Sequence, residues 1–213
     1  MFQYQIHFLK SLGITKQVLF YTNQVHGNDV YVLRDSKVST IEVNQQEADA
    51  IVTHLPDCPL MVFTADCVPI IIYDPVKNLT GVVHAGRVGT QKRIFSNTIN
   101  VLSQEYGAKP QDLIIGMGPA IRGCCYEVSK HCIIPFINRR SKSPDCVKKI
   151  DQENYLLDLP EVNRLEGLEA GVLEKNIYIR GPCTSCDNHR WYSYRKEGRT
   201  GRLMTLAMIR SKK

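Results

Sequence analysis

Long hydrophobic runs are missing from this chain of 213 residues. No window holds the roughly 18 uninterrupted apolar residues that a membrane-spanning helix needs. The opening stretch MFQYQIHFLKSLG also lacks the basic region followed by a long apolar region that marks a secretory signal. We therefore expect a soluble, cytoplasmic protein without a membrane partner.

Signatures of nucleic-acid binding are equally scarce. The formal net charge is +6, but the 27 Lys and Arg residues are scattered along the chain rather than gathered in one tract. The sequence contains no RNA-recognition signature, zinc-finger spacing or basic leucine zipper pattern. The charge is compatible with small anionic ligands, and no nucleic acid is expected as a partner.

Internal repeats, low-complexity tracts and linkers are absent as well. With 43% hydrophobic and 23% charged residues, a length of 213 residues suits one globular domain that spans residues 1–213. Eight cysteines are more than usual for this length. Because no signal peptide is found, we interpret them as thiols or metal ligands rather than as a disulfide framework.

Short β-rich runs alternate with a few helical patterns along the chain. Apolar runs of about four to six residues between turn-forming residues predict strands. Apolar residues at helical spacing, followed by glycine or proline, predict helices that stop there. We expect strands at 18–22, 30–33, 50–53, 60–64, 70–73, 81–85, 176–180 and 203–209, helices at 90–106, 129–138 and 159–170, and a polar loop at 181–201.

Polar side chains stand where three of these strands end or begin. His26 follows a strand in YTNQVHGND, Cys67 lies between two strands in VFTADCVPI, and His84 ends a strand in GVVHAG. Imidazole nitrogen and thiolate sulfur suit Zn²⁺ or copper, and three protein ligands with an open fourth position are typical of a catalytic zinc site. Taken singly, each histidine fits a hydrogen-bonded loop residue and the cysteine a small core residue. The metal site is therefore a hypothesis at this point.

The remaining cysteines offer a second, weaker hypothesis. GPCTSC places Cys183 and Cys186 at C-x₂-C spacing, and GCCYE contains the adjacent pair Cys124 and Cys125. These four thiols could build a structural zinc site. Against it, adjacent cysteines point in divergent directions, and the sequence has no second C-x₂-C.

The order of several motifs resembles that of the YfiH-like family. These motifs are NQVHGNDV, ADAIVT, TADCVPIIIYD, VVHAG, IGMGPAI with CCYEV, and a closing CT followed by YSYRKEGRTGR. Members of this family are called polyphenol oxidase or multicopper laccase, laccase domain protein, and purine nucleoside phosphorylase. The resemblance extends over most of the chain and is specific because the motifs occur together and in order.

The resemblance implies a fold, a metal and an activity. The implied fold is a single α+β domain of mixed β-sheets flanked by α-helices, a YfiH-like four-layer sandwich. The implied metal is Zn²⁺, with copper as the alternative, bound by His26, Cys67 and His84. The implied activity is phosphorolysis of adenosine, guanosine, inosine and S-methyl-5′-thioadenosine, with inorganic phosphate as co-substrate, together with deamination of adenosine to inosine.

Further residues are candidates for this chemistry. Deamination needs a proton shuttle beside the activated water, and Asp66, next to the metal cysteine, is our candidate unless its side chain turns away to bind backbone amides. Phosphorolysis needs cationic or N–H donors for phosphate. The candidate phosphate and substrate contacts are Arg195, Arg199 and Arg202, the glycine turn at Gly118, and Tyr194 as a surface for a purine. The bland alternative for the arginines is a solvated basic loop.

The chain departs from the family pattern in two places. The family commonly reads H-A-G-W-R-G, whereas this chain reads HAGRVG, with Arg87 and Val88 at the tryptophan and arginine positions. Many members also carry an additional N-terminal segment with an R-x-G-G motif, so we expect the domain at 1–213 to lack it.

Other functions remain open on the same residues. The alternatives are a copper-dependent polyphenol oxidase, a hydrolase in which Cys67 attacks and His84 or His26 is the base, and a non-catalytic metal-binding interaction protein. Six histidines in the whole chain are few for a multicopper centre. We expect a monomer or a weak homodimer.

Overall fold

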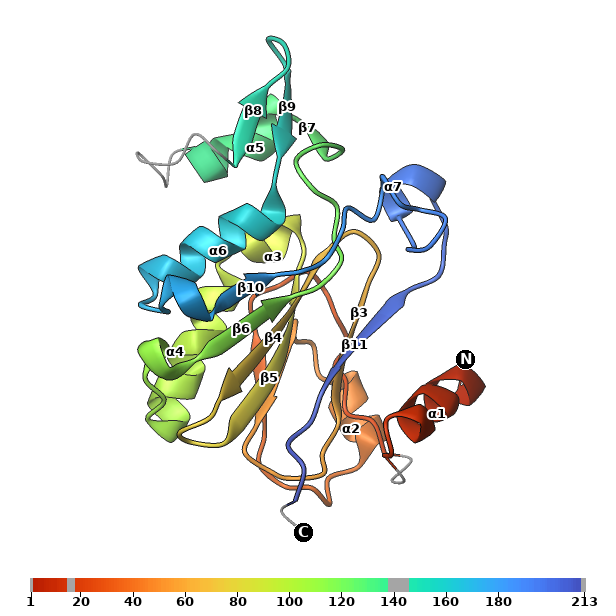
Figure 1. The fold of residues 1–213 in the computed structure, drawn as a ribbon, viewed down its shortest axis with the longest axis vertical. Coiled ribbons are helices and arrows are strands. Elements are labelled where there is room, and N and C mark those ends of the chain that lie inside the picture. Colours follow the sequence, from red (N-terminus) through yellow and green to blue (C-terminus); the bar gives the residue numbers. More distant parts are fainter. Residues whose placement is uncertain (1, 15–17, 138–145, 212–213) are drawn as a thin grey trace.

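β-branched runs form a six-stranded mixed sheet at the centre of the molecule (Figure 1). The computed structural model describes residues 2–14, 18–137 and 146–211. The sheet has the order β1-β2-β5-β4-β6-β10, parallel in its two outer pairs and antiparallel elsewhere. Its strands are β1 (Val30–Leu33), β2 (Ala50–Thr53), β4 (Val68–Asp74), β5 (Leu79–Ala85), β6 (Ile114–Met117) and β10 (Ile177–Ile179).

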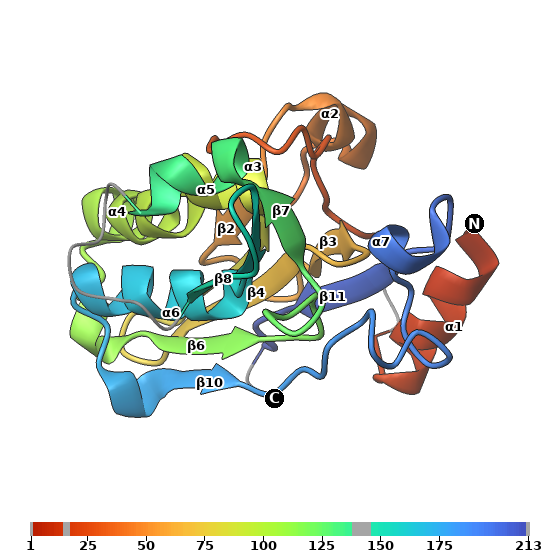
Figure 2. The same cartoon turned by 90° about the horizontal axis from the view of Figure 1, so that it is seen from above.

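Helices cover one face of this sheet and a second, smaller sheet covers the other. The helical side holds α3 (Arg87–Gln91), α4 (Ile94–Tyr106) and α6 (Leu159–Glu169). On the other side β3 (Leu60–Thr64) pairs antiparallel with β11 (Leu203–Ala207), with α1 (Phe2–Ser11) and α2 (Thr40–Gln45) further out (Figure 2). This arrangement confirms the predicted α+β fold of mixed sheets flanked by helices.

Burial on both faces explains the continuous apolar sequence of the central strands. Every residue of β2 and β5 is buried. Alternate residues serve two cores, because Val83 packs toward the helices whereas Val82 packs toward the small sheet. The central strands are thus clamped between two apolar layers, which gives the side chains at their ends fixed positions.

The predicted helix at 90–106 is two helices in the structure. Arg93 has a left-handed backbone, with φ of 64°, and separates α3 from α4. Phe95, Ile99 and Leu102 bury one face of α4, and Gly107, with φ of 65°, ends it as expected. The other two predicted helices are found as α5 (Lys130–Ile137) and α6, and the predicted last residue of the former, Asn138, lies outside the described residues.

The prediction of a strand at 18–22 is wrong. This stretch makes one isolated parallel bridge, between Phe20 and Leu60, in which the Phe20 N–H donates to the Pro59 carbonyl and the Met61 N–H donates to the Phe20 carbonyl, and the pairing extends no further. The predicted loop at 181–201 contains one helical turn, α7 (Tyr194–Glu197). A three-stranded sheet was not predicted, and it consists of β7 (Glu127–Ser129), β9 (Asn154–Leu157) and β8 (Val147–Lys149). In the described part of the chain, no helix has the length and apolar character needed to cross a membrane.

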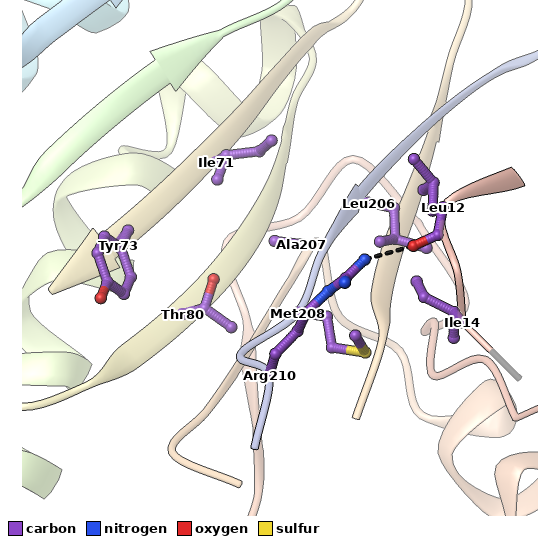
Figure 3. A pocket seen from close by; sticks show the side chains of 9 residues that line it. All are labelled: Leu12, Ile14, Ile71, Tyr73, Thr80, Leu206, Ala207, Met208 and Arg210. Atoms are coloured by element: carbon purple, nitrogen blue, oxygen red, sulfur yellow. Dashed lines mark hydrogen bonds between the residues drawn. The ribbon is translucent and has the colours of Figure 1, made fainter. Parts of the chain in front are cut away.

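A hollow of about 450 Å³ lies between the end of α1, β11 and the β4–β5 turn (Figure 3). Among the described residues that line it, Arg210 is the charged one, and its guanidinium donates to the Leu12 carbonyl. These described lining residues include no histidine, cysteine or carboxylate, and Tyr73 and Thr80 lie at the opposite end of the β4–β5 hairpin from Cys67 and His84. The described lining therefore offers no group for the predicted chemistry.

Candidate metal centre and active site

The register of the β4–β5 hairpin brings Cys67 and His84 together. His84 pairs with Pro69 near the start of β4, and Cys67 is the residue just before that strand. Because β4 and β5 are antiparallel, the beginning of one lies beside the end of the other. The turn that carries Cys67 also links the small sheet to the large one, so both layers fix its position.

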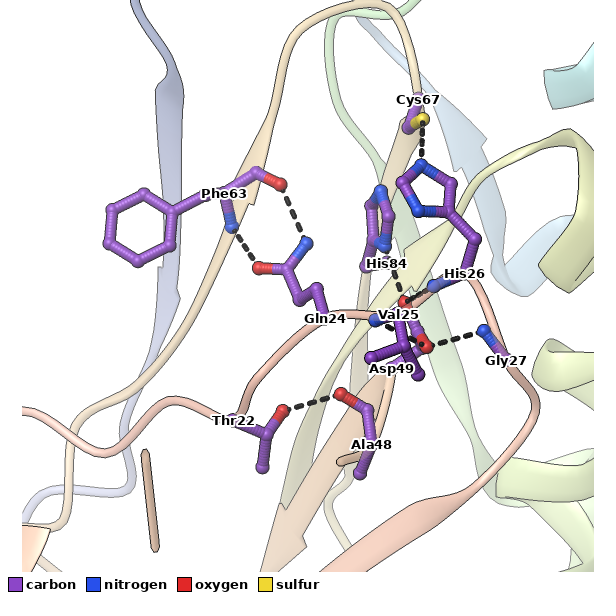
Figure 4. A network of polar contacts seen from close by, with 10 residues as sticks. All are labelled: Thr22, Gln24, Val25, His26, Gly27, Ala48, Asp49, Phe63, Cys67 and His84. Atoms are coloured by element: carbon purple, nitrogen blue, oxygen red, sulfur yellow. Dashed lines mark hydrogen bonds and ion pairs between the residues drawn. The ribbon is translucent and has the colours of Figure 1, made fainter. Parts of the chain in front are cut away.

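Asp49 lies directly behind His84. Ala50 pairs with Val83 between β2 and β5, which places the preceding residue, Asp49, opposite His84. The carboxylate is fully buried, and its Oδ1 lies 2.7 Å from Nδ1 of His84 (Figure 4). A proton on Nδ1 for this bond leaves the lone pair of Nε2 available to a metal.

The same carboxylate holds the loop that carries His26. Its two oxygens accept from the backbone N–H groups of Val25, His26 and Gly27 at 2.6 to 3.2 Å (Figure 4). On the other side of the loop, the Gln24 side-chain amide exchanges two hydrogen bonds of 2.8 Å with the backbone of Phe63 in β3. These bonds stabilise the left-handed backbone of His26, which has φ of 59°.

The three predicted ligands converge. Their ligand atoms all lie within 4.8 Å of one another, and Nε2 of His26 is 3.8 Å from Sγ of Cys67. The two imidazole rings meet edge to face, with centroids 4.7 Å apart. His84 is buried and His26 is exposed, so the group lies at the surface end of the sheet, where a fourth ligand can enter.

Gly86 is the residue that allows this close approach. A Cβ atom added there would lie 2.7 Å from Cδ2 of His26 and 3.1 Å from Sγ of Cys67. A side chain at this position would therefore push two of the three ligands apart. The glycine of the HAG motif is thus required for the close packing of the site.

Electrostatics favours the ionised forms of Cys67 and Asp49. Burial raises the pKa of Cys67, but hydrogen bonds and charge from His26 and His84 outweigh it and lower the pKa to about 6. Burial lowers the pKa of His84, but Asp49 and Cys67 outweigh it and raise the pKa to about 9. For Asp49, burial raises the pKa, but the hydrogen bonds from His84 and from the loop N–H groups outweigh burial and lower the pKa below its ordinary value.

A metal ion suits this donor set. A thiolate and two imidazoles at these separations match a three-ligand zinc site with an open position, and a carboxylate behind one histidine is the usual outer partner. The structure therefore brings the three residues that the sequence predicts as ligands together in a candidate metal site.

Asp66 takes the second of the two roles considered for it. Its Oδ1 accepts from the Thr184 hydroxyl and its Oδ2 from the backbone N–H of Arg195, both at 2.6 Å. Its backbone is left-handed, with φ of 84°, which turns the side chain away from the direction a strand residue would take. The carboxylate thus fastens the start of α7 beside the Cys67 turn.

Arg195 is the predicted cation that the structure ties to the site. Its Nη1 donates to the Glu127 carbonyl at 2.6 Å, and its guanidinium lies 4.9 Å from the ring centre of Tyr126. The charges of Arg87, Arg195 and Cys67 all act on the pKa of Tyr126, which burial raises. Arg195 therefore lies beside Tyr126, and Arg87 directly follows Gly86, which packs against Cys67.

The other predicted contacts are less well placed. The N–H of Gly118 donates to the Pro69 carbonyl at 3.0 Å, and the N–H groups of Ile121 and Arg122 also have protein acceptors, so this turn does not present free donors to phosphate. Arg202 donates to the carbonyls of Thr200 and Gly201 in its own loop. Arg199 and Tyr194 are exposed, and within the described residues no hydrogen bond, ion pair or ring contact joins them to the metal ligands.

Sequence reasoning missed Asp49 and Tyr126 as site residues. Asp49 stands in the quoted motif ADAIVT, one residue before a predicted strand, and the adjacent GVVHAG strand ends on His84. A pairing of those two strands would have identified it. Tyr126, in CCYEV, gave no comparable signal.

Comparison with known proteins identifies the family of this chain. A family model described as multi-copper polyphenol oxidoreductase laccase matches residues 4–210. The chain belongs to this family. Two solved structures superpose closely on this chain. Hypothetical protein YfiH of Bacillus licheniformis has a TM-score of 0.91 and 28% identity, and the match covers 98% of this chain and 80% of that chain. YlmD of Geobacillus stearothermophilus has a TM-score of 0.92 and 29% identity, and the match covers 99% of this chain and 80% of that chain. The expected YfiH-like resemblance is confirmed.

Similar proteins with curated names are called purine nucleoside phosphorylases rather than laccases. Purine nucleoside phosphorylase YlmD of Bacillus subtilis is 34% identical over 191 residues, which cover 87% of this chain and 68% of that protein. Purine nucleoside phosphorylase LACC1 of Mus musculus is 28% identical over 190 residues, which cover 87% of this chain and 42% of that protein. The chain thus spans less than half of the mouse relative.

Proposed function

We propose that this chain is a zinc-dependent purine nucleoside phosphorylase that acts on adenosine, guanosine, inosine and S-methyl-5′-thioadenosine and also deaminates adenosine. The observation that carries the proposal is the convergence of His26, Cys67 and His84, with Asp49 behind His84. The names of the relatives supply the reaction class. Copper is the alternative metal for the same donor set.

His26, Cys67 and His84 would hold the ion through Nε2, Sγ and Nε2. When bound, Zn²⁺ acts as a Lewis acid and can make a water nucleophilic near neutral pH. Asp49 keeps the His84 proton on Nδ1 and holds the ring in place, while its bonds to the loop position His26. The ligand geometry is thus set before substrate arrives, which is the condition for electrostatic stabilisation without reorganisation.

Arg195 and Arg87 are our candidates for binding the phosphate. Arg87 directly follows Gly86, which packs against His26 and Cys67, and the backbone of Arg195 is bound to Asp66, the residue before Cys67. A guanidinium matches the oxygens of a phosphate in geometry as well as charge. Asp66 is a positioning residue in this proposal, because it binds the backbone N–H of Arg195, while phosphate would replace the Glu127 carbonyl as the acceptor of Arg195 Nη1.

The test is product analysis of zinc-loaded protein with each nucleoside, with and without phosphate. The proposal expects base and sugar 1-phosphate only when phosphate is present, and inosine from adenosine without it. His84→Ala and Cys67→Ser should abolish both reactions, and Cys132→Ser serves as a control because Cys132 is outside the triad. Zinc-loaded, folded protein that turns over no nucleoside would support a non-catalytic metal-binding role instead.

A cysteine hydrolase is the second candidate, and one observation favours it. The lowered pKa of Cys67 and the raised pKa of His84, with Asp49 on the far side of the imidazole, also match a Cys-His-Asp catalytic triad. The two candidates differ in whether the thiolate is committed to a metal. If zinc blocks alkylation of Cys67 and supports turnover, the phosphorylase proposal holds; if zinc inhibits an esterase or amidase activity that alkylation also removes, the hydrolase is correct.

A further inference from the structure

A second group of potential metal ligands lies outside the triad. The structure brings Sγ of Cys124, Cys125, Cys183 and Cys186 within 4.8 Å of one another. The expectation that the adjacent cysteines diverge is wrong here, because both Cys124 and Cys125 lie next to Cys186, at 3.5 and 3.3 Å between sulfurs. The reason is the tight turn that holds them, in which the N–H groups of Cys125 and Tyr126 both donate to the Arg122 carbonyl.

Parallel strands explain how distant segments meet at this point. β6 and β10 pair in parallel, so their carboxyl ends lie at the same edge of the sheet. The segments that follow β6 and β10 continue side by side (Figure 1). Ala120 forms a parallel bridge with Cys183, and the Thr184 N–H donates to the Ala120 carbonyl. The turn with Cys124 and Cys125 and the C-x₂-C segment therefore face each other.

The spacing of the sulfurs fits a tetrahedral ion. Zn–S bonds of about 2.3 Å place the corners of a ZnS₄ tetrahedron about 3.8 Å apart. The sulfur of Cys186 lies slightly closer than this to the sulfurs of Cys124 and Cys125, and the other sulfur pairs of the group lie within 4.8 Å. Small side-chain rotations would thus place all four sulfurs around one ion.

One sulfur of the cluster also accepts a backbone hydrogen bond. The N–H of Arg122 donates to Sγ of Cys183 at 3.5 Å. A backbone donor of this kind suits a sulfur that carries negative charge, as a metal-bound thiolate does.

We infer that Cys124, Cys125, Cys183 and Cys186 bind a structural zinc ion, separate from the triad. Binding would release the thiol protons to solvent and close four Zn–S bonds, with no oxidation or reduction. The ion would link the turn after β6 to the long segment before α7. Thr184 lies between two of the ligands in sequence, and its hydroxyl donates to Asp66. Because Asp66 also binds the backbone N–H of Arg195, the ion would also restrict the position of the segment that carries Arg195.

The test is the zinc content of the whole chain, expressed with zinc and purified without oxygen. Elemental analysis should find two zinc ions in the unmodified chain, one in Cys186→Ser, one in His84→Ala and two in Cys132→Ser. Cys132 is the matched control, since it is half-buried and belongs to neither ligand group. X-ray absorption of His84→Ala should show its remaining zinc bound by four sulfurs at about 2.3 Å.

Two results would overturn the inference. One is equal zinc content in Cys186→Ser and the unmodified chain; the other is a remaining zinc in His84→Ala that has nitrogen or oxygen ligands. An intact mass that shows disulfides among these four cysteines in the anaerobic protein would also contradict it. If Cys186→Ser does not fold, the absorption measurement on His84→Ala decides, because it leaves all four thiols in place.

Discussion

Replacement of Asp49 by asparagine is the sharpest test of how the triad is built. Oδ1 of Asp49 accepts from His84 and from the His26 N–H, and Oδ2 accepts from the N–H groups of Val25 and Gly27. Asparagine has one oxygen and one NH₂ group, so whichever way it turns, one pair of donors faces another donor. Since hydrogen bonds to a charged group contribute about 1.5 to 3 kcal/mol each, the loss of two should lower the free energy of unfolding by about 3 kcal/mol or more.

The effect on zinc has a separate cause. If the NH₂ group faces His84, the imidazole must present Nδ1 as an acceptor and carry its proton on Nε2, where the metal would bind. If it faces the other way, the loop that carries His26 loses its acceptor. Outer-sphere changes of this kind typically cost 10- to 100-fold in metal affinity, and we expect that range for Asp49→Asn.

Competition with a chromogenic chelator measures the zinc affinity, and urea unfolding of the zinc-free chain measures stability. Asp74→Asn is the matched control: Asp74 is also a buried carboxylate, its Oδ1 accepts from Val76 and Lys77, and among the described residues no donor reaches its Oδ2. The control should keep its zinc affinity. Equal zinc affinity in Asp49→Asn and the unmodified chain would refute the role given to this residue.

Three further predictions follow from the same contacts. Gly86→Ala should weaken zinc binding by tenfold or more, because its Cβ would displace His26 and Cys67. The variant should change the urea midpoint of unfolding little. An unchanged zinc affinity in chelator competition would count against the site geometry. Asp66→Asn should raise the KM for phosphate by about tenfold through a misplaced Arg195 while zinc content stays constant, and steady-state kinetics at varied phosphate would detect this. In zinc-free protein the pKa of Cys67, lowered to about 6, should keep the thiolate populated above that pH, so iodoacetamide alkylation should fall as the pH drops through about 6; a midpoint near 9 would contradict it.

The central strands and two of the three triad residues were predictable from sequence for a physical reason. Strands buried on both faces are nearly continuous apolar runs, so a polar residue at the end of one is conspicuous. His84 and Cys67 stand out in this way, and the structure places them at adjacent strand ends. Apolar spacing and a terminal glycine likewise reveal most of α4.

Features that depend on tertiary pairing were not predictable. The backbone at 18–22 has strand composition, but its pairing with the start of β3 stops at a single bridge between Phe20 and Leu60. Arg93 gives no local signal for the left-handed break before α4. The meeting of Cys124 and Cys125 with Cys186 depends on the parallel pairing of β6 and β10, about which cysteine spacing says nothing.

Phosphorus NMR of zinc-loaded protein with adenosine and phosphate tests the proposed function most directly. We predict that a sugar phosphate monoester signal grows in step with released adenine, and that Cys67→Ser, supplied with the same zinc, produces neither. Release of adenine without consumption of phosphate, or equal product formation by Cys67→Ser, would contradict the assignment of a phosphorylase to this metal centre.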